Sequence, residues 1–454
     1  MSTPTTNSVP RTFINTALLG VGRYVGHGEK WGGGLGTGVT LTFSFPNLGY
    51  WSTSPAYGDG TKEYQSMYAM NSYEQAAAKS AMAVWSHFAN INFVQTSDTQ
   101  TNVGDIRFAL STKLPTGTAA WAYYPSTNPA GGDVWFNTKY FNLGRNAINA
   151  GDYDYLTILH ELGHALGLKH TFSTPNAAPL SVDNYFYSIM AYTASPWSAH
   201  QKNYASFYPT TPMYYDLVAI EALYGQRSYN TGNNAYVFYD GVKYWQAIND
   251  TGGSDYIQYV GAENVTINLN PGTFSTLSEA IQFQKAGGGY VYSKATVTIG
   301  PNVWIESAVG GNGNDTLIGN NYGNGLYGQN GNDLLIGNFG NDYLSTGIGY
   351  DTVRFSTAPN SVTNHDTVSD YNPAYDTIQL ENAVFTKIGN GTPFINPAFF
   401  RNAAHALDSN DYIVYNQATG NLFYDDNGYL AGHEILIATF TNKPVLNYLE
   451  FQII

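Results

Sequence analysis

The spacing of apolar and polar positions predicts helices and strands in the first half of the chain. Residues 73–90 place apolar side chains at helical intervals, and Asn71 or Ser72 could cap the start of this helix. Alternating β-branched and aromatic residues predict strands at 91–94, 104–110, 117–124 and 133–136. This mixture predicts an α/β domain.

Two further helices are predicted before residue 225. One spans 154–166, and the other spans 212–224, with Thr211 as its expected cap and Gly225 just beyond its end. Past Gly225 the helical spacing stops, and short strands separated by Asn, Gly and Asp continue to the C-terminus. We therefore place a boundary near residue 228 between a mixed domain (1–228) and an all-β domain (229–454).

A nine-residue period runs through about 310–354 of the second domain. Five consecutive units share a glycine near the start and an apolar residue at the eighth place, and all but the second also have a glycine at the fourth place and an aspartate at the sixth. The second unit is degenerate, since Asn324 replaces its aspartate. Such repeats are typical of a parallel β-roll that binds calcium between stacked turns, with the eighth side chain inside.

Composition excludes several classes of partner and chemistry. The 454 residues contain 33 acidic and 19 basic side chains, which disfavours binding to nucleic acid. There is no cysteine, so a metal must be held by His, carboxyl or carbonyl groups. Neither an N-terminal export signal nor an apolar run long enough to span a bilayer is present, and we expect residues 1–40 to be a propeptide or an irregular segment.

The stretch HELGHALGLKH, residues 160–170, predicts a zinc site. His160 and His164 lie four residues apart and share one face of the predicted helix, while Glu161 is displaced to one side. Gly167 can end the helix with a positive φ and turn His170 back toward the same point. Three imidazoles are a typical ligand set for a catalytic zinc that keeps one position open.

Further along, Met190 and Tyr192 follow the histidines in the segment SIMAYT. With HExxHxxGxxH and the nonapeptide repeat, this segment makes the chain resemble the serralysin family of metzincin metallopeptidases. The resemblance spans roughly residue 73 to the C-terminus. Thr171 departs from the family, which usually has a proline there, and the segment between His170 and Met190 is short.

The resemblance implies a secreted zinc endopeptidase stabilised by calcium. One catalytic zinc would be held by the three histidines, with Glu161 assisting the attack of zinc-bound water, Met190 beneath the metal and Tyr192 as a displaceable ligand. A protein or peptide substrate would pair with the edge strand formed by Ala119, Ala120, Trp121 and Ala122. The resemblance also implies bacterial type I secretion through a C-terminal signal and a proteinaceous inhibitor as a further partner, and we expect a monomer.

Several structural calcium ions are expected from the repeat and from a loop upstream of it. In the upstream loop the expected ligands are Asp250, Gly252, Gly253 and Asp255. In the repeat they are Gly310, Asn312, Gly313, Asp315, Gly328, Asn330, Gly331, Asp333, Gly337, Phe339, Gly340, Asp342, Gly349 and Asp351. The segment 230–234 lacks the aspartate of such a loop and is a poor candidate.

One alternative of a different class remains open from the sequence. The chain could be a calcium-dependent surface or adhesion protein whose peptidase module is inactive. The complete set of zinc ligands together with Glu161 favours the enzyme, because an abandoned site is expected to lose its general base first.

Overall fold

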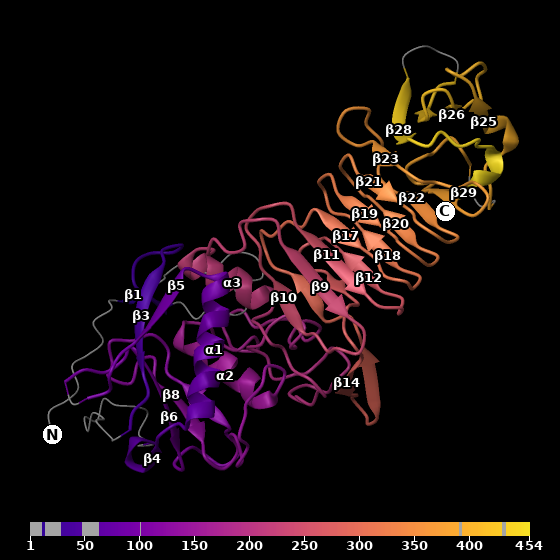
Figure 1. Ribbon diagram of the computed structural model, residues 1–454. Coiled ribbons are helices and arrows are strands. Elements are labelled where there is room, and N and C mark those ends of the chain that lie inside the picture. Colours follow the sequence, from indigo (N-terminus) through magenta and orange to yellow (C-terminus); the bar gives the residue numbers. More distant parts are fainter. Residues whose placement is uncertain (1–10, 14–28, 48–62, 100, 390–392, 429–432) are drawn as a thin grey trace. The chain divides into compact units, whose positions relative to one another are not determined.

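The computed structural model describes residues 11–13, 29–47, 63–99, 101–389, 393–428 and 433–454 (Figure 1). The chain forms two compact units that are not continuous in sequence. Unit 1 comprises Met1–Tyr229, Lys243–Thr251 and Ala280–Ser293, and unit 2 comprises Asn230–Val242, Gly252–Glu279 and Lys294–Ile454. None of the described helices combines the length and apolar character needed to cross a bilayer.

A mixed sheet and three α-helices dominate the described part of unit 1. The sheet order is β5-β3-β6-β8-β7, with β4 on β6, and only the pairs β7–β8 and β4–β6 are antiparallel. The strands of unit 1 are β1 (Arg11–Phe13), β2 (Glu29–Trp31), β3 (Val39–Ser44), β4 (Met67–Tyr68), β5 (Ile91–Gln95), β6 (Ile106–Ser111), β7 (Ala120–Ala122), β8 (Val134–Asn137), β10 (Gln246–Ile248), β14 (Ile281–Gln284) and β15 (Tyr290–Ser293), and a 3-10 turn, η2, spans Glu63–Ser66. The predicted strands are confirmed, with ends shifted by a few residues.

Helix α1 (Ser72–Phe88) begins at Asn71, one of the two predicted caps. The Asn71 side chain accepts from the backbone of Tyr73 and Glu74, while the Glu74 carboxylate accepts from the Asn71 N–H. The buried stripe of α1 includes Ala78, Met82 and Trp85. Trp85 Nε1 donates to the carbonyl of Leu159 in α2 (Tyr153–Ala165), so α1 holds the helix that carries the predicted metal ligands.

Helix α3 (Tyr214–Tyr224) starts later than predicted. Its N-cap is Met213. The prediction that Thr211 caps this helix is wrong, because the Thr211 hydroxyl donates to the Pro212 carbonyl and accepts from the Ala247 N–H. The helix end is as predicted, since Gly225 follows it with φ +80°. An added Cβ on Gly225 would lie 2.7 Å from the Gly36 carbonyl oxygen, so no other residue fits there without displacement.

The glycine-rich segment 30–38 begins in the core of unit 1 at Lys30 and Trp31, and its residues 33–38 are exposed. Lys30 is fully buried, and its ammonium group donates to the carbonyls of Gly33, Gly34 and Thr37. Trp31 Nε1 donates to the Ala165 carbonyl at the end of α2. This part of the predicted propeptide or irregular segment is therefore ordered against the ligand helix, whereas 1–10 and 14–28 lie outside the described residues.

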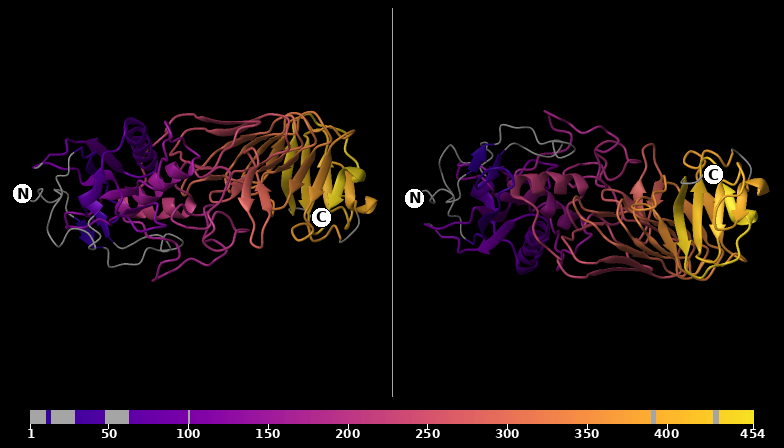
Figure 2. Two further views of the ribbon diagram at one scale, coloured as in Figure 1. Left: turned by 90° about the horizontal axis from the view of Figure 1, so that it is seen from below. Right: turned by 90° about the horizontal axis from the view of Figure 1, so that it is seen from above.

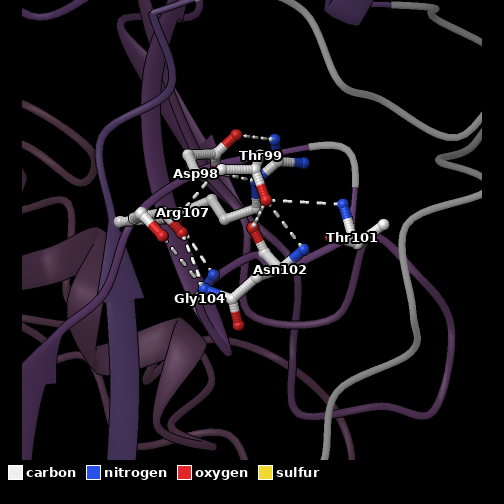
Figure 3. Close-up of polar contacts among 8 residues, drawn as sticks. Asp98, Thr99, Thr101, Asn102, Gly104 and Arg107 are labelled. Carbon is white, nitrogen blue, oxygen red and sulfur yellow. Dashed lines mark hydrogen bonds and ion pairs between the residues drawn. The ribbon is translucent and has the colours of Figure 1, made fainter.

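The connection between β5 and β6 is held by side chains rather than by regular structure (Figure 3). Thr99 Oγ1 accepts from the N–H groups of Thr101 and Asn102. Arg107 reaches back from β6 and makes a two-point ion pair with Asp98, with both side chains only 2% exposed. Because the paired charges satisfy each other, these two side chains can be buried, although Thr99 and Asn102 of the turn are exposed.

Unit 2 is built from two large sheets and contains no α-helix in its described residues. One sheet has the order β25-β26-β27-β28-β23-β21-β19-β17-β11-β9, and the other has the order β12-β18-β20-β22-β24-β29. Figures 1 and 2 show these strands stacked one after another, from pink through orange to yellow. The prediction of an all-β second half is confirmed for the residues described.

The strands of unit 2 are mostly short. They are β9 (Ala235–Tyr239), β11 (Tyr256–Val260), β12 (Thr266–Asn268), β13 (Phe274–Ser275), β16 (Val297–Ile299), β17 (Ser307–Val309), β18 (Thr316–Ile318), β19 (Gly325–Tyr327), β20 (Leu334–Ile336), β21 (Tyr343–Ser345), β22 (Thr352–Phe355), β23 (Asp366–Val368), β24 (Thr377–Leu380), β25 (Phe400–Asn402), β26 (Ile413–Asn416), β27 (Asn421–Asp425), β28 (Glu434–Phe440) and β29 (Phe451–Ile453), with 3-10 turns η3 (Pro397–Phe399) and η4 (Tyr448–Glu450).

The nine-residue period sends successive repeat units to alternate sheets. Thr316 of β18 pairs in parallel with Leu334 of β20, eighteen positions further on, and β17 pairs in the same way with β19. The residues at the eighth place of the five units are all 0% exposed: Leu317, Leu326, Leu335, Leu344 and Val353. Full burial of each such side chain contributes about 1.5–3 kcal/mol, which explains the strict repeat at that place.

Candidate active site

Helix α2 presents two of the predicted zinc ligands from one buried face. His160 is 7% and His164 is 5% exposed, and their rings lie 4.7 Å apart, centroid to centroid. Nearly every residue of the helix is buried, which fixes the direction of both side chains.

The bend after the helix brings in the third imidazole. Gly167 adopts φ +102°, as predicted, and an added Cβ there would lie 2.2 Å from the carbonyl oxygen of Glu29. The bend therefore requires glycine for both conformation and space. It returns His170 so that the ligand atoms of His160, His164 and His170 all lie within 4.8 Å of one another.

Hydrogen bonds orient the imidazole lone pairs toward a common centre. The Nδ1 atoms of His160 and His164 lie 2.7 Å from the carbonyl oxygens of Ile189 and Leu168, so each Nδ1 must donate. Their Nε2 atoms then carry lone pairs, and Nε2 of His164 lies 3.1 Å from Nε2 of His170. Lone pairs facing each other at this distance repel unless a proton or a cation lies between them.

Two buried atoms at the centre of the site have no hydrogen-bond partner. They are Nε2 of His160 and Oε2 of Glu161. Burial lowers the pKa of His160 to about 4 and that of His170 to about 3, the latter also through the charges of His160 and Lys169. The imidazoles of His160 and His170 are thus neutral at pH 7, as metal ligands must be, and the residues present fit a divalent cation.

The methionine turn lies directly beneath the ligand helix. Met190 is fully buried, and a Cβ added to Gly163 would lie 2.7 Å from its sulfur atom. Gly163 sits between the two helical histidines, so its lack of a side chain allows the methionine to approach the turn that carries them. Ile189, which precedes Met190, is the residue whose carbonyl accepts from His160.

Asp216 supports this turn, and the sequence analysis missed it. Its carboxylate, fully buried in α3, accepts from the Ser188 hydroxyl and from the N–H groups of Ile189 and Met213. Burial raises the pKa of Asp216 to about 7, although the hydrogen bonds oppose this rise. The available signal was an acid at the third position of a helix in which Glu221 is the only other charged residue.

We expect Asp216→Ala to lower the free energy of unfolding of unit 1 by about 3 kcal/mol, because it leaves buried donors unpaired. Zinc affinity should fall about tenfold, since the Ile189 carbonyl would no longer be held against His160. Urea unfolding and competition with a zinc chelator measure the two effects. Asp426→Ala, which removes a half-exposed carboxylate, is the control, and equal effects of the two variants would contradict this role.

A cleft of about 280 Å³ lies beside His160 and Glu161. Its walls include His160, Glu161, Tyr153, Tyr185, Gln201 and Asn203, with Gly117–Ala120 along one side. Tyr192 also lines it, 41% exposed, with its ring centroid 4.6 Å from that of His170. Burial and the charge of Glu161 raise the pKa of Tyr192, so its phenol stays protonated near pH 7.

The predicted substrate strand is the edge strand of the sheet in unit 1. Strand β7 pairs only with β8 among the described strands, and its residues are half-buried. The carbonyl of Ala119 and the N–H of Tyr123 both bond to the side of β8. Alternation along the strand therefore turns the backbone groups of Ala120 and Ala122 toward the free edge.

The aspartates of the repeat form two columns in unit 2. In one column, the N–H of each aspartate donates to Oδ1 of the next, in the order Asp315, Asp333, Asp351, Asp376. In the other, Asn324 N–H donates to Asp342, and Asp342 N–H to Asp366. Oδ2 of Asp333, Asp342 and Asp351 is buried and has no partner, as expected of atoms built to meet cations.

Asp366 and Asp376 extend the columns beyond the predicted repeat. The signal was the triplet Asp-Thr-apolar, which both residues share with Asp315 and Asp351. It was missed because the nine-residue spacing ends near residue 354.

The glycines that open the repeat units lie against the carboxylates. A Cβ on Gly310 would lie 2.6 Å from Oδ2 of Asp315, and one on Gly328 would lie 2.5 Å from Oδ2 of Asp333. The glycines at the fourth place of alternate units are stacked on one another. A Cβ on Gly331 would meet the carbonyl of Gly313, and a Cβ on Gly349 would meet the carbonyl of Gly331. Asn330 Nδ2 donates to Asn312 Oδ1, while Phe339 is 50% exposed and Gly340 adopts φ +120°. Turn carbonyls lie close to the same points as the carboxylates, since the added Cβ atoms on Gly310 and Gly328 would also meet the carbonyl oxygens of Gly328 and Thr346.

The predicted upstream calcium loop is divided between the units. Asp250 belongs to unit 1, and Gly252, Gly253 and Asp255 belong to unit 2. Gly252 and Gly253 adopt φ +148° and +140°, and Oδ1 of Asp255 accepts from Asn234 N–H.

Comparison with known proteins identifies two metallopeptidase regions. Residues 49–204 match the family model described as Metallo-peptidase family M12, and residues 216–437 match Peptidase M10 serralysin C terminal. The chain is 31% identical over 275 residues to a serralysin of Photorhabdus luminescens, covering 55% of this chain and 53% of that protein. It is 32% identical over 314 residues to serralysin B of Dickeya chrysanthemi, covering 63% of this chain and 59% of that protein.

A further relative is metallopeptidase AprA of Pseudomonas marginalis, 31% identical over 312 residues, which cover 62% of this chain and 60% of that protein. The chain thus spans somewhat more than half the length of the curated relatives it matches. The resemblance predicted from the zinc motif and the repeat is confirmed.

Proposed function

We propose that this chain, a relative of the serralysin metallopeptidases, is a zinc-dependent endopeptidase that hydrolyses peptide bonds in proteins. The observation that supports this most is the unpartnered Oε2 of Glu161 beside three converging imidazoles. Apart from this triad, no group of three or more His, Cys, Asp or Glu residues in the described part of the chain has ligand atoms close enough to hold a metal.

His160, His164 and His170 would hold the zinc. When bound, zinc lowers the pKa of a coordinated water and polarises a carbonyl group. Glu161 takes the proton from the attacking water and delivers it to the amine that leaves. Burial raises the pKa of Glu161 to about 8, and the positive charge of a bound cation would oppose that rise and favour the ionised carboxylate that acts as a base.

The edge strand would orient the substrate. An extended peptide paired with the free backbone groups of Ala120 and Ala122 lies along the cleft wall that Ala119 and Ala120 form. Trp121 is part of the same strand, between the two alanines. The protonated phenol of Tyr192, which also lines the cleft, can donate a hydrogen bond to the oxygen on which charge develops.

Removal of zinc should abolish activity. In a buffer that keeps calcium, an excess of a zinc-selective chelator is expected to reduce casein hydrolysis at least about hundredfold, and one equivalent of zinc should restore it. Calcium alone should not restore it. Hydrolysis that ignores the chelator would contradict the zinc mechanism, and zinc-loaded protein that hydrolyses nothing would favour the alternative of an adhesion protein.

In unit 2 we propose structural calcium ions between stacked turns of a β-roll. The unpartnered Oδ2 atoms and the converging turn carbonyls support this, since calcium takes six or more oxygen ligands. The ligands are those predicted from the repeat, together with Asp366 and Asp376. The loop of Asp250, Gly252, Gly253 and Asp255 is proposed as a further calcium ligand set on its sequence alone.

A chain whose second unit folds only with calcium is suited to export in an unfolded state. We therefore propose an extracellular location after bacterial type I secretion, with Glu450–Ile454 as part of the C-terminal signal. Protein substrates, the secretion machinery and a proteinaceous inhibitor are the proposed partners of a monomer.

A further inference from the structure

A small sheet next to the cleft of unit 1 exposes an array of tyrosines that the proposed catalytic mechanism does not use. Hairpin β14–β15 pairs through β14 with the segment 204–206, by the bridge between Ala205 and Phe283 and by hydrogen bonds from Ser206 and Gln284 N–H groups. On one face of this sheet lie Tyr204, Gln282, Tyr290 and Tyr292, which we call the tyrosine platform. We propose that the tyrosine platform binds an unfolded segment of a protein substrate beyond the part held in the cleft, an inference that rests on the proposed function.

The register explains why these side chains share a face. Gln282 is opposite Tyr292, and Gln284 is opposite Tyr290, so all four point to the same side. The residues between them point inward, where Ile281 and Phe283 are both fully buried. Phe283 packs against Trp245 and Phe186, with centroid distances of 5.3 and 5.5 Å. The core thus anchors the hairpin, which stands apart from the helices in Figure 1.

The tyrosine platform is exposed yet internally ordered. Tyr204, Tyr290 and Tyr292 are 42%, 55% and 62% exposed, although tyrosine has a large apolar ring. The Tyr204 hydroxyl donates to Gln282 Oε1 at 3.4 Å, and Gln282 Nε2 donates to the Tyr292 hydroxyl at 2.9 Å. The rings of Tyr204 and Tyr290 lie 6.1 Å apart. Binding therefore needs little further ordering of these side chains.

The tyrosine platform is continuous in sequence with the cleft wall. Gln201 and Asn203 line the cleft, and Tyr204 follows them directly. Asn203 Nδ2 donates to the hydroxyl of Tyr153, which also lines the cleft. A polypeptide that leaves the cleft past Asn203 thus meets Tyr204 and the tyrosine platform.

The chemistry of the surface fits a polypeptide without folded structure. None of the four side chains is charged, and exposed tyrosines bind apolar side chains and peptide planes at low entropic cost. Strand β15 pairs only with β14 among the described strands, so its outer edge offers backbone groups to an extended chain.

The test compares long and short substrates. In the Glu161→Gln background, Tyr290→Ala/Tyr292→Ala should weaken the binding of reduced, unfolded casein about tenfold more than that of a six-residue peptide, as measured by fluorescence anisotropy. In the active enzyme, the ratio of kcat/KM for casein to that for the peptide should fall by a similar factor. The control is Tyr73→Ala, which removes a ring that is 50% exposed at the start of α1.

Equal losses for both substrates, or unchanged casein binding, would overturn the inference. A second contradicting outcome is that the protein is retained on an insoluble polysaccharide through Tyr290 and Tyr292 while casein binding does not depend on them. The tyrosine platform would then bind carbohydrate, and the inference would be overturned. An unaltered chain that hydrolyses nothing but binds casein through the tyrosine platform would reject the proposed function and leave this inference standing.

Discussion

Exchange of Glu161 for glutamine should lower kcat for casein about 10³-fold and leave zinc binding intact. Glutamine keeps the size of the side chain but cannot accept a proton, and positioned general acid–base groups contribute about 10²–10⁴-fold to rate. The buried Oε2 of Glu161 makes no hydrogen bond in the described structure, so its replacement disturbs no partner. Steady-state kinetics and elemental analysis of the same preparation measure the two properties.

Glu434→Gln, in a strand of unit 2, provides the control for loss of one negative charge. It should retain full activity. If Glu161→Gln lost zinc in proportion to activity, Glu161 would be a structural group and the proposed base would be wrong. If the variant kept most of its activity, another residue would have to move the proton.

The second large effect is expected from calcium removal, which should unfold the roll of unit 2. Without cations, the Oδ2 atoms of Asp333, Asp342 and Asp351 remain buried in the two columns with no hydrogen-bond partner, which destabilises the folded state. Each ion that binds only the folded state adds about 2.7 kcal/mol at a concentration 100 times its Kd. Circular dichroism and limited proteolysis during titration with a calcium chelator, followed by readdition of calcium, measure the transition.

The pH dependence of the calcium-free protein follows from the same carboxyl groups. Burial raises the pKa of Asp333 to about 7 and that of Asp351 to about 6, with nearby aspartates adding to the rise. Between pH 4 and 7 the unfolded state thus binds fewer protons than the folded state, and stability falls as pH rises. The calcium-free roll should be most stable near pH 4 to 5, and saturating calcium should remove this slope. A calcium-free roll that is equally stable at pH 5 and 8 would contradict the proposal.

Asn324→Asp is the matched variant for this experiment. Asn324 Nδ2 donates to the carbonyl oxygens of Ile305 and Glu306, at 3.4 and 3.3 Å, so an amide satisfies oxygens that a cation could otherwise bind. The variant places a carboxylate above Asp342 and should gain one calcium ion by isothermal titration. It should also be less stable than the unaltered protein when calcium is absent.

The helices and the inner positions of the repeat could be predicted from sequence because each depends on neighbours along the chain. The residues of the 160–170 motif are close along the chain, so the geometry of the helix and of the bend after it places their side chains, and Gly167 has the predicted conformation. The eighth place of each repeat unit is buried as expected, since one nine-residue rule places every such side chain inside.

The remaining features depend on contacts between distant segments, which spacing does not reveal. Asp216 supports a turn that lies 26 to 28 residues earlier in the chain, through Ser188 and Ile189. Thr211 was expected to cap α3, but its hydroxyl bonds locally and to β10, while Asp216 accepts from the backbone N–H of the N-cap residue Met213. The tyrosine platform joins residue 204 to residues near 290 and has no local pattern at all.

The contact of Glu29 with Gly167 limits how far the chain can be trimmed from its N-terminus. The Glu29 carbonyl fills the space beside the glycine that turns His170 toward the other ligands. Trp31, two residues further along the chain, donates a hydrogen bond to the last residue of the ligand helix. Proteolytic cleavage upstream of residue 29 would leave the metal-binding bend intact. An exopeptidase that digested past Trp31 would remove the residues that pack against the bend leading to the third histidine.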